Sequence, residues 1–321
     1  MVYSRILGTG SYLPTEELTN HDLEKIVETS HDWIVERTGI HSRHRAAPNQ
    51  STLDLAYEAA LKAIESAHIA PETLDLIILT SGTPDYFMPA MSCQLQQRLG
   101  AHCPAFDMNA ACSGFVYGLG VADQFIKAGT AKTILLVGAE MMSRLMDWND
   151  RTTCVLFGDG AGAVVLQASE EPGILSTHLY ADGQYWALLQ ARNPQVQYYG
   201  QDTFSKGAVF MDGKKVFKTA VTKLEELVQH VMEHHQMTSD QIDWLIPHQA
   251  NNRIIDATAA KLNLPLDRVV RTIAHQGNTS SASIPLALDA AVRDGRVQRG
   301  QNLLLEAFGA GLTWGAALIR Y

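Results

Sequence analysis

Cys112 is the first side chain in this sequence that could act as a nucleophile. It follows the strand-like stretch PAFDMNA, and a helical pattern begins just beyond it. The unpaired N–H groups and the positive dipole end of a helix N-terminus favour the thiolate, the reactive form of cysteine. Its neighbours Ala110, Ala111, Ser113 and Gly114 are small, so a substrate has room to approach. A buried structural thiol, the commoner use of an unpaired cysteine, fits this stretch as well.

His248 is a second candidate, because it stands where a strand is expected to end. The apolar residues Trp244–Pro247 lead into it, and a helical segment follows. Reactive groups of α/β proteins gather at the ends of strands. An ordinary polar loop histidine is the alternative, so the spacing alone leaves its role open.

Asn278 is a third candidate, which follows a glycine at the expected start of a helix. In isolation it could simply be a helix N-cap. An ungapped alignment of residues 112–129 with residues 278–295 places it opposite Cys112. If this similarity reflects two copies of one α/β unit, both helix N-termini point to one central place, where His248 also lies. The convergence of three polar groups from separate segments predicts an active site.

Strands and helices alternate along the chain, as in an α/β fold with buried parallel strands. The predicted elements are strands at Leu74–Gly82, Lys132–Glu140 and Gln301–Gly309, and helices at Thr52–Ile69 and Lys218–Gln236. The last of these helices ends in His234 and His235, which are adjacent and therefore point in different directions. We expect both histidines to be solvated.

The repeat also predicts how the chain is divided. Polar residues and a proline interrupt the apolar pattern at Ala168–Gly173. We predict an N-terminal half, residues 1–170, that carries the nucleophile, and a C-terminal half, residues 171–321, that carries the histidine and the asparagine. A chance match of short α/β segments is the alternative. The alignment further pairs Asp123 with Asp289, Lys127 with Arg293 and Gly129 with Gly295.

Composition limits the class of protein. The 321 residues are 46% hydrophobic, which is enough for a large core, and no apolar run predicts a membrane span. The N-terminus shows no secretory signal, and a cytoplasmic location is expected. The net charge of −9 argues against nucleic acid or an anionic membrane as a partner, and an acidic partner would need a local basic patch. The four cysteines show neither metal-ligand spacing nor a disulfide framework: Cys93, Cys103, Cys112 and Cys154.

Segments along nearly the whole chain match one known family in order: ILGTGSYLP, DWIVERTGIHSRH, AACSGF, FGDGAGAVVL, PHQANNRII, GNTSSAS and AFGAGLTWGAALIRY. The chain resembles the condensing enzymes of the thiolase superfamily, and specifically the β-ketoacyl-acyl carrier protein synthase III family, which initiates bacterial fatty acid synthesis. The resemblance implies a thiolase-like αβαβα fold of five layers, made of two duplicated halves, and a homodimer.

The third active-site position distinguishes the members of this superfamily. Elongating ketosynthases have a second histidine there and thiolases a second cysteine, whereas this chain has Asn278. The resemblance therefore implies an initiating synthase or a plant-polyketide relative, and those relatives are usually longer. An acyl-CoA primer such as acetyl-CoA would acylate Cys112. His248 and Asn278 would then hold the thioester oxygen of malonyl-acyl carrier protein while CO2 leaves, because fixed donors stabilise the enolate. The resemblance implies no metal and no cofactor beyond the acyl-CoA substrate.

The resemblance also implies a site for CoA. Trp33 and Arg37, with Arg151 nearby, would grip the adenine and phosphates, for which an aromatic face and guanidinium groups are apt. Asn251 would line the pantetheine channel, and Gly213 would let the arm pass. A core tryptophan is the alternative role of Trp33.

Residues of the HQANNR motif are implied to contact the carrier protein. Lys214 and Lys215 could extend this contact into the local basic patch that an acidic carrier protein requires. The implied contacts are Gln249, Ala250, Asn252 and Arg253.

Two further segments shape the expected site. The backbone N–H groups of Cys112 and Ala310 are the implied oxyanion donors, and Ala310 replaces the central glycine that many relatives have. An alanine keeps its N–H, so oxyanion binding survives unless a positive φ is needed there. The loop Gly82–Ala90, with Phe87 and Met88, would shape the primer pocket across the dimer, and its bulk implies a short primer.

Three other classes of protein fit parts of the pattern. Papain-like proteases also use cysteine, histidine and asparagine, but their cysteine motif and secretory signal are absent. A non-catalytic acyl-CoA-binding relative would not need all three residues. A synthase of a specialised pathway, which joins another acyl group or uses malonyl-CoA as acceptor, is the nearest alternative.

Overall fold

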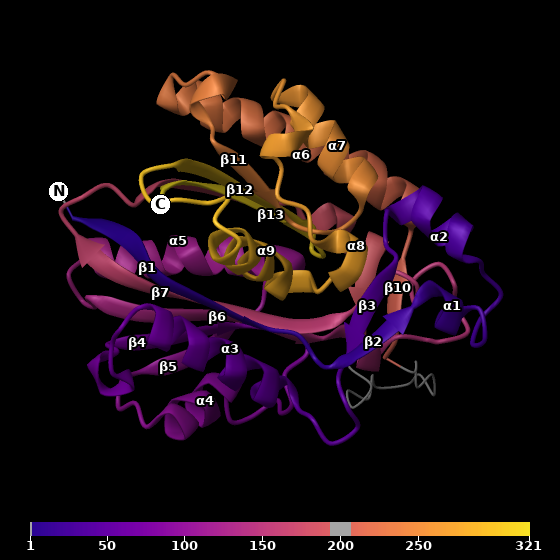
Figure 1. The fold of residues 1–321 in the computed structure, drawn as a ribbon, viewed down its shortest axis with the longest axis horizontal. Helices are drawn as coiled ribbons and strands as arrows, with labels where there is room; N and C mark the ends of the chain where they lie inside the picture. The colour runs from indigo at the N-terminus through magenta and orange to yellow at the C-terminus, as the bar shows by residue number, and fades with distance from the viewer. Residues whose placement is uncertain (1, 193–206) are drawn as a thin grey trace.

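The computed structural model describes residues 2–192 and 207–321. Two large β-sheets alternate with three layers of helices, so the layers run helix, sheet, helix, sheet, helix (Figure 1). Two small sheets of two strands each, β2 with β3 and β9 with β10, lie outside these layers among the described residues. Helices α5 (Gly114–Lys127) and α9 (Ser283–Arg293) form the layer between the two sheets. The predicted five-layered α/β fold is confirmed.

The first sheet has five strands in the order β1, β7, β6, β4, β5. Strands β6, β4 and β5 are parallel, and β7 is antiparallel to both of its neighbours. Helices α3 and α4 cover the outer face (Figure 1). Helix α3 begins with a capping box, in which Ser51 and Asp54 satisfy each other's backbone N–H groups. The elements are β1 Tyr3–Tyr12, α3 Thr52–Ser66, β4 Leu76–Thr80, α4 Met91–Leu99, β5 Ala105–Met108, β6 Thr133–Met141 and β7 Asp159–Ser169.

The second sheet has four strands in the order β11, β12, β13, β8, and helices α6 and α7 cover its outer face (Figure 1). Read from β8, this order repeats that of the first sheet from β1. A single bridge between Leu245 and Val269 stands where the first sheet has its fifth strand. The elements are β8 Ile174–Ala181, α6 Gly213–His235, β11 Trp244–Pro247, α7 Asn252–Lys261, β12 Asn302–Gly309 and β13 Thr313–Arg320.

The connection between the two sheets lies where the polar residues interrupt the sequence. Strand β7 ends at Ser169 and β8 begins at Ile174. The division of the chain into two units at this point stays a prediction.

The two central helices are anchored in the same way at their C-terminal ends. Asp123 and Asp289 are buried, and each pairs with the basic residue four positions later. Both carboxylates also accept hydrogen bonds from β1: Asp123 from Ser4 at 2.8 Å, and Asp289 from Thr9 at 2.7 Å and Ser11 at 2.5 Å. The aligned pairs in this part of the repeat therefore occupy equivalent positions.

The alignment is wrong at the N-terminal ends of these helices. Asn109 and Asn278 each accept the backbone N–H two residues later, at Ala111 and Ser280. Ala111 and Ser280 both have positive φ, 47° and 50°. Asn278 is therefore the counterpart of Asn109, not of Cys112. The reason is that α5 has 14 residues and α9 has 11, so an ungapped alignment cannot match both ends.

The strands and helices predicted from periodicity are confirmed within a few residues, except that α6 starts earlier, after the N-cap Asp212. Among the described residues, no helix is both long and apolar enough to cross a membrane. Smaller elements complete the fold: β2 Glu16–Thr19, α1 Asn20–Leu23, α2 His31–Thr38, β3 Ser42–Arg45, β9 Leu189–Ala191, β10 Val209–Met211 and α8 Ile273–Gln276. Short 3-10 turns lie at Pro71–Thr73, Ala111–Ser113, Met142–Leu145, Gly183–Leu188, Ser239–Gln241, Leu266–Arg268 and Ser280–Ala282.

Candidate active site

Cys112 lies in a 3-10 turn between the edge strand β5 and the N-terminus of α5. Its side chain is buried. The last residue of β12, Gly309, approaches so closely that a β-carbon there would stand 2.8 Å from the nitrogen of Cys112. The second sheet thus contacts the backbone of the nucleophile candidate directly, and only a glycine permits this approach.

His248 directly follows β11, and its backbone N–H donates to the carbonyl of Glu306 at 2.7 Å. The ring is buried, with Nδ1 2.6 Å from the hydroxyl oxygen of Ser283 at the start of α9. Burial lowers the pKa of His248 to about 3. The imidazole is therefore neutral at physiological pH, and Ser283 fixes its orientation.

Asn278 is held by its backbone and by its side-chain oxygen. Its N–H donates to the carbonyl of Leu156 at 2.9 Å, and its carbonyl accepts from Gly158 at 3.0 Å. Oδ1 accepts from the N–H of Ser280 at 2.8 Å. Because Oδ1 is used in this way, the side-chain NH2 group is the part that remains to donate to a ligand.

Cys112, His248 and Asn278 line one cavity of about 660 Å³. Apolar side chains of α6 form much of its wall, and Trp33 and Arg37 also line it. A cavity of this size, apolar with a few convergent polar groups, is typical of small-molecule sites. The three side chains that the sequence nominated are thus brought together from three separate segments.

Of the residues expected to bind a nucleotide, Trp33 and Arg37 line the cavity, and Arg151 lies beside Trp33 outside the lining. The guanidinium carbons of Arg37 and Arg151 lie 5.1 and 5.4 Å from the ring centroid of Trp33. Asn251 caps α7 and donates from Nδ2 to the carbonyl of Arg37 at 3.0 Å, which ties α7 to α2. Gly213, the first residue of α6, also lines the cavity.

The HQANNR motif divides into inward and outward residues. Gln249 is buried, and its amide bridges the carbonyls of Pro247 and Val270 and the N–H groups of Thr272 and Ile273. The expected contact of Gln249 with a carrier protein is therefore wrong, because the side chain is inaccessible and already hydrogen-bonded.

The other residues of the motif lie nearer the surface. Ala250 lines the cavity, and Asn252 packs its side chain against Gly39. Arg253 is exposed, with its guanidinium 5.1 Å from the ring of Phe217. Of the expected carrier-protein contacts, Arg253 is the one that presents a charge to solvent.

The expected thiolate form of Cys112 does not agree with its surroundings. Burial raises the pKa of Cys112 to about 12, a hydrogen bond with Ser280 opposes the rise, and the nearby Glu140 adds to it. The dipole of α5 favours the thiolate of Cys112, but the burial of the sulfur away from water disfavours the charged form and has the larger effect. Burial in the cavity therefore favours the thiol form of Cys112.

Two buried carboxyls were not anticipated. Glu140 is the penultimate residue of the apolar strand β6, and its carboxylate accepts from the N–H of Gly82 and the hydroxyls of Thr83 and Ser281. Glu306 lies in β12, lines the cavity, and has an Oε2 without a hydrogen-bond partner within the described residues. Burial raises the pKa of Glu306 to about 8, against an opposing hydrogen bond from Thr258. A lone glutamate inside an apolar strand was the available signal for both.

The turn after β12 and the loop before α4 complete the expected site residues. Gly311 has a positive φ of 136°, whereas Ala310 does not have a positive φ. The alanine in the GAG segment therefore adopts an ordinary backbone conformation. Phe87 is 65% exposed and lies outside the cavity lining of its own chain. Its expected place in a partner's pocket stays a prediction.

Comparisons with known proteins identify the family of the chain. Residues 106–183 match the family described as 3-oxoacyl-(acyl-carrier-protein) synthase III, and residues 232–321 match the C-terminal part of that family. The chain is 58% identical to the beta-ketoacyl-(acyl-carrier-protein) synthase III of Xanthomonas campestris pv. campestris, across 100% of this chain and 99% of that one.

Solved structures show the same likeness. The 3-oxoacyl-(acyl-carrier-protein) synthase III of Aquifex aeolicus is 48% identical, with a TM-score of 0.93 over 99% of this chain and 100% of that one. A priming β-ketosynthase of a polyketide biosynthetic pathway is 36% identical, with a TM-score of 0.94 over 99% and 96%. The full-length identity and the shared fold show that this chain belongs to the 3-oxoacyl-(acyl-carrier-protein) synthase III family of condensing enzymes.

Proposed function

We propose that the chain catalyses the decarboxylative Claisen condensation of an acyl-CoA primer, acetyl-CoA in the first instance, with malonyl-acyl carrier protein. The products are a 3-ketoacyl-acyl carrier protein, CoA and CO2, and the reaction initiates fatty acid biosynthesis. The observation that carries the proposal is the cavity in which Cys112, His248 and Asn278 meet, with Trp33 and Arg37 also in its lining. Neither a metal nor a redox cofactor takes part.

In the first half-reaction the sulfur of Cys112 attacks the acyl thioester. A new thioester forms on Cys112, the bond to the CoA sulfur breaks, and the thiol proton ends on the released CoA. Because burial favours the thiol form of Cys112, its proton must be accepted as the sulfur attacks. A neutral His248 with an unprotonated Nε2 can accept it.

In the second half-reaction His248 must donate instead of accept. Loss of CO2 from the malonyl group leaves negative charge on the thioester oxygen, and the NH2 group of Asn278 together with an Nε2–H of His248 would stabilise it. The resulting carbanion attacks the acyl group on Cys112, and the cysteine sulfur leaves and takes up a proton. The cycle therefore needs both neutral tautomers of His248.

Ser283 is chemically suited to this change of tautomer. Its hydroxyl oxygen accepts the N–H of Gln249 at 3.3 Å and lies 2.6 Å from Nδ1 of His248. A hydroxyl can donate to Nδ1 when Nε2 carries the proton, and can accept from Nδ1–H when it does not. A carboxylate at this position would favour only one tautomer.

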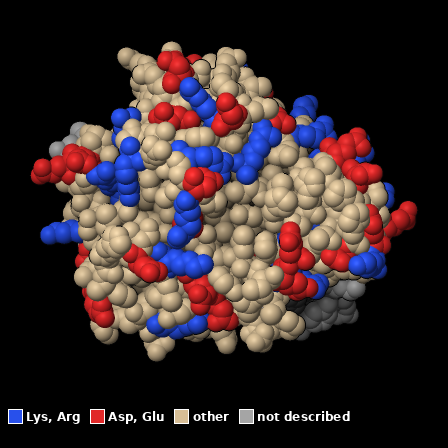
Figure 2. All heavy atoms as spheres, in the orientation of Figure 1, with Lys and Arg blue, Asp and Glu red and all other residues tan. Residues whose placement is uncertain are grey.

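The entrance of the cavity supports docking of an acidic carrier protein. Arg253 and Lys214 are exposed and both line the cavity, whereas Lys215 is already paired with Asp212 at 2.9 Å. Elsewhere charges of both signs are mixed over the visible face (Figure 2). Local pairing at Arg253 and Lys214 would therefore act against the net charge of −9 of the whole chain.

We further propose a cytoplasmic homodimer. Strand β5 is an edge of the first sheet, and its residues Ala105–Met108 are only half-buried. Exposed sheet edges pair readily with another strand. Tyr86, Phe87 and Met88 are 58%, 65% and 83% exposed, which also favours a partner surface. All four cysteines are free thiols, as expected in a reducing compartment.

The test is incubation of the protein with a series of acyl-CoAs, followed by mass spectrometry of the peptide that contains Cys112. We expect acetylation of Cys112 and none of Cys93, which is exposed and reports non-specific acyl transfer. If no acyl-CoA modifies Cys112, the mechanism is wrong.

Addition of malonyl-acyl carrier protein or malonyl-CoA to the acylated enzyme then identifies the acceptor. We expect rapid condensation with the carrier protein. A preference for malonyl-CoA would instead favour a synthase of a specialised pathway, such as the polyketide relative with 36% identity.

A further inference from the structure

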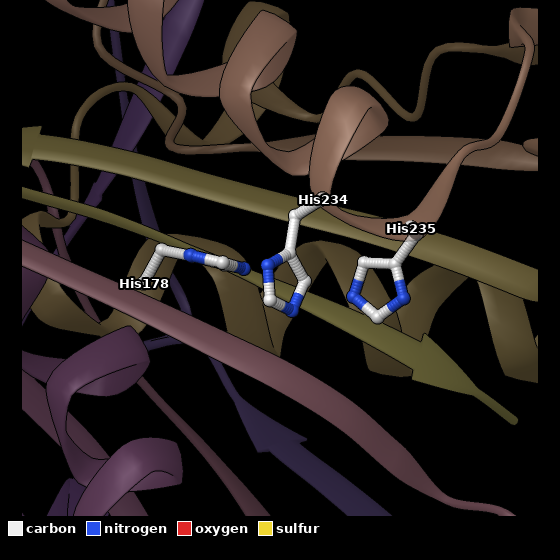
Figure 3. Close-up of side chains that lie close together, drawn as sticks. All are labelled: His178, His234 and His235. Carbon is white, nitrogen blue, oxygen red and sulfur yellow. The ribbon is translucent and has the colours of Figure 1, made fainter.

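Three histidines from two elements converge on the outer side of the second sheet. His178 lies in β8, and His234 and His235 form the last turn of α6 (Figure 3). One ring nitrogen from each can be chosen so that all three lie within 4.8 Å of one another. The expectation that both histidines are solvated holds for His234, which is exposed, but is wrong for His235, which is half-buried because α6 packs its end against β8.

The rings are packed against one another. The ring centroids of His178 and His234 are 5.1 Å apart, and those of His234 and His235 are 4.9 Å apart. His230, one helical turn before His234, lies 5.1 Å from His178. The sequence HVMEHH at the end of α6 thus presents its imidazoles to a fourth one from a strand.

Ser176 shows that ring nitrogens from both elements already point to one position. Its hydroxyl oxygen lies 2.6 Å from Nε2 of His235 and 3.0 Å from Nε2 of His178. The hydroxyl has one hydrogen and can donate it to only one of the two rings. Ring nitrogens of His178 and His235 thus face the same small volume beside Ser176. A cation bound in that volume could be coordinated by both nitrogens.

We propose that His178, His234 and His235 bind a divalent transition-metal ion of the Zn2+ class. Imidazole is a preferred ligand of Zn2+, Cu2+ and Ni2+, and three histidines with one water make a common tetrahedral set. Bonds of about 2.0–2.1 Å place tetrahedral ligands about 3.3 Å apart. The three ring nitrogens lie within 4.8 Å of one another in the structure, so the rings must rotate slightly to bring the nitrogens to this closer spacing. The exposed ring of His234 would make this rotation, and the hydroxyl of Ser176 would move to the outside of the site.

The site is distant from the cavity described above. The cavity wall uses the N-terminal half of α6, from Gly213 to Leu224, whereas the histidines lie at the C-terminal end of the helix. At about 1.5 Å per residue, the 10 residues from Leu224, the last of these cavity-lining residues, to His234 span about 15 Å. The proposal therefore stands independently of the condensation chemistry. A metal ion bound by these histidines would link the C-terminal end of α6 to the edge strand β8.

The test uses the full chain without an affinity tag, stripped of metal. Titration with Zn2+ by calorimetry should show one saturable equivalent, Zn2+ should raise the Tm, and Co2+ should give the visible absorption bands of a tetrahedral site. His178→Ala should weaken Zn2+ binding by about tenfold or more and abolish the Tm increase. His102→Ala, which removes an exposed histidine outside the cluster, should change neither.

Two results would overturn the proposal. One is the absence of saturable binding to the wild-type chain. The other is unchanged affinity in His178→Ala, which would mean that the helical pair His230 and His234 binds metal without the strand. If His178→Ala loses its fold, shown by its Tm without metal, His235→Ala gives the same comparison, because it removes a proposed ligand and leaves the pair His230 and His234 intact.

Discussion

Replacing Asn278 with aspartate would keep one hydrogen bond of this side chain and remove another. Oδ1 accepts from the backbone N–H of Ser280 at 2.8 Å. Aspartate can still accept this hydrogen bond, but it has no N–H to offer to the oxygen of a malonyl thioester. Alanine at the same position loses both interactions. The pair of variants therefore separates the structural part of Asn278 from its proposed part in decarboxylation.

The two losses differ in size. A buried hydrogen bond such as that to Ser280 contributes about 1 kcal/mol to the free energy of unfolding, so Asn278→Ala should be slightly less stable and Asn278→Asp less affected. Removal of one donor from an oxyanion site lowers the rate about 10²- to 10³-fold, or about 2.7–4 kcal/mol. Both variants should lose decarboxylation to at least that extent, because the aspartate charge also repels the enolate.

The half-reactions can be measured separately. Acylation of Cys112 is followed by mass spectrometry after rapid mixing with acetyl-CoA, and decarboxylation by release of labelled CO2 from malonyl-acyl carrier protein. We expect Asn278→Ala to acylate Cys112 near the wild-type rate. Equal loss of both half-reactions in that variant, or normal decarboxylation in Asn278→Asp, would refute the role derived from the geometry.

Three further substitutions test neighbouring parts of the site. Ser283→Ala removes the 2.6 Å contact with His248 and should slow decarboxylation by about fivefold, the equivalent of about 1 kcal/mol. The rate is measured as release of labelled CO2. An unchanged rate would mean that Ser283 does not orient the ring of His248. Glu306 has a native pKa raised to about 8, so its contribution to stability is present at low pH and lost as pH rises through 8. Glu306→Gln should therefore flatten the fall in the free energy of unfolding between about pH 5 and about pH 9, measured with urea, and an unaltered pH dependence would contradict this assignment. Arg253→Glu should raise the KM for malonyl-acyl carrier protein about tenfold at low salt and less at high salt, with acylation by acyl-CoA unchanged. Arg268→Glu, an exposed charge change outside the cavity, is its control, and equal defects in the two variants would argue against docking at Arg253.

The sequence was most informative where local periodicity and fold agree. Buried strands such as β6 and amphipathic helices such as α3 follow from apolar patterning, and both were predicted closely. The convergence of Cys112, His248 and Asn278 was also predictable, since the similarity of the two halves indicated that their helix N-termini meet. The alignment that suggested it was nevertheless shifted at Asn278, because helix length cannot be read from an ungapped match.

The parts that sequence could not supply depend on contacts between distant residues. The inward direction of Gln249 follows from its hydrogen bonds with residues 270–273, which no local pattern reveals. The thiol form of Cys112 follows from burial by several elements and not from its position at a helix N-terminus. In the same way, His234 and His235 acquire a neighbour in His178 only because α6 ends beside β8.

The anchoring of both central helices on β1 has a consequence for the order of folding. Ser4 in this first strand binds the carboxylate of Asp123, and Thr9 and Ser11 bind that of Asp289, near the other end of the chain. During synthesis β1 emerges first, but its second carboxylate partner emerges only after most of the chain has been made. The buried hydroxyls of β1 must therefore stay hydrated or bind elsewhere until then. Contacts over 278 and 280 residues close very long loops of the chain, so assembly of the central layer is expected to be a late and slow event.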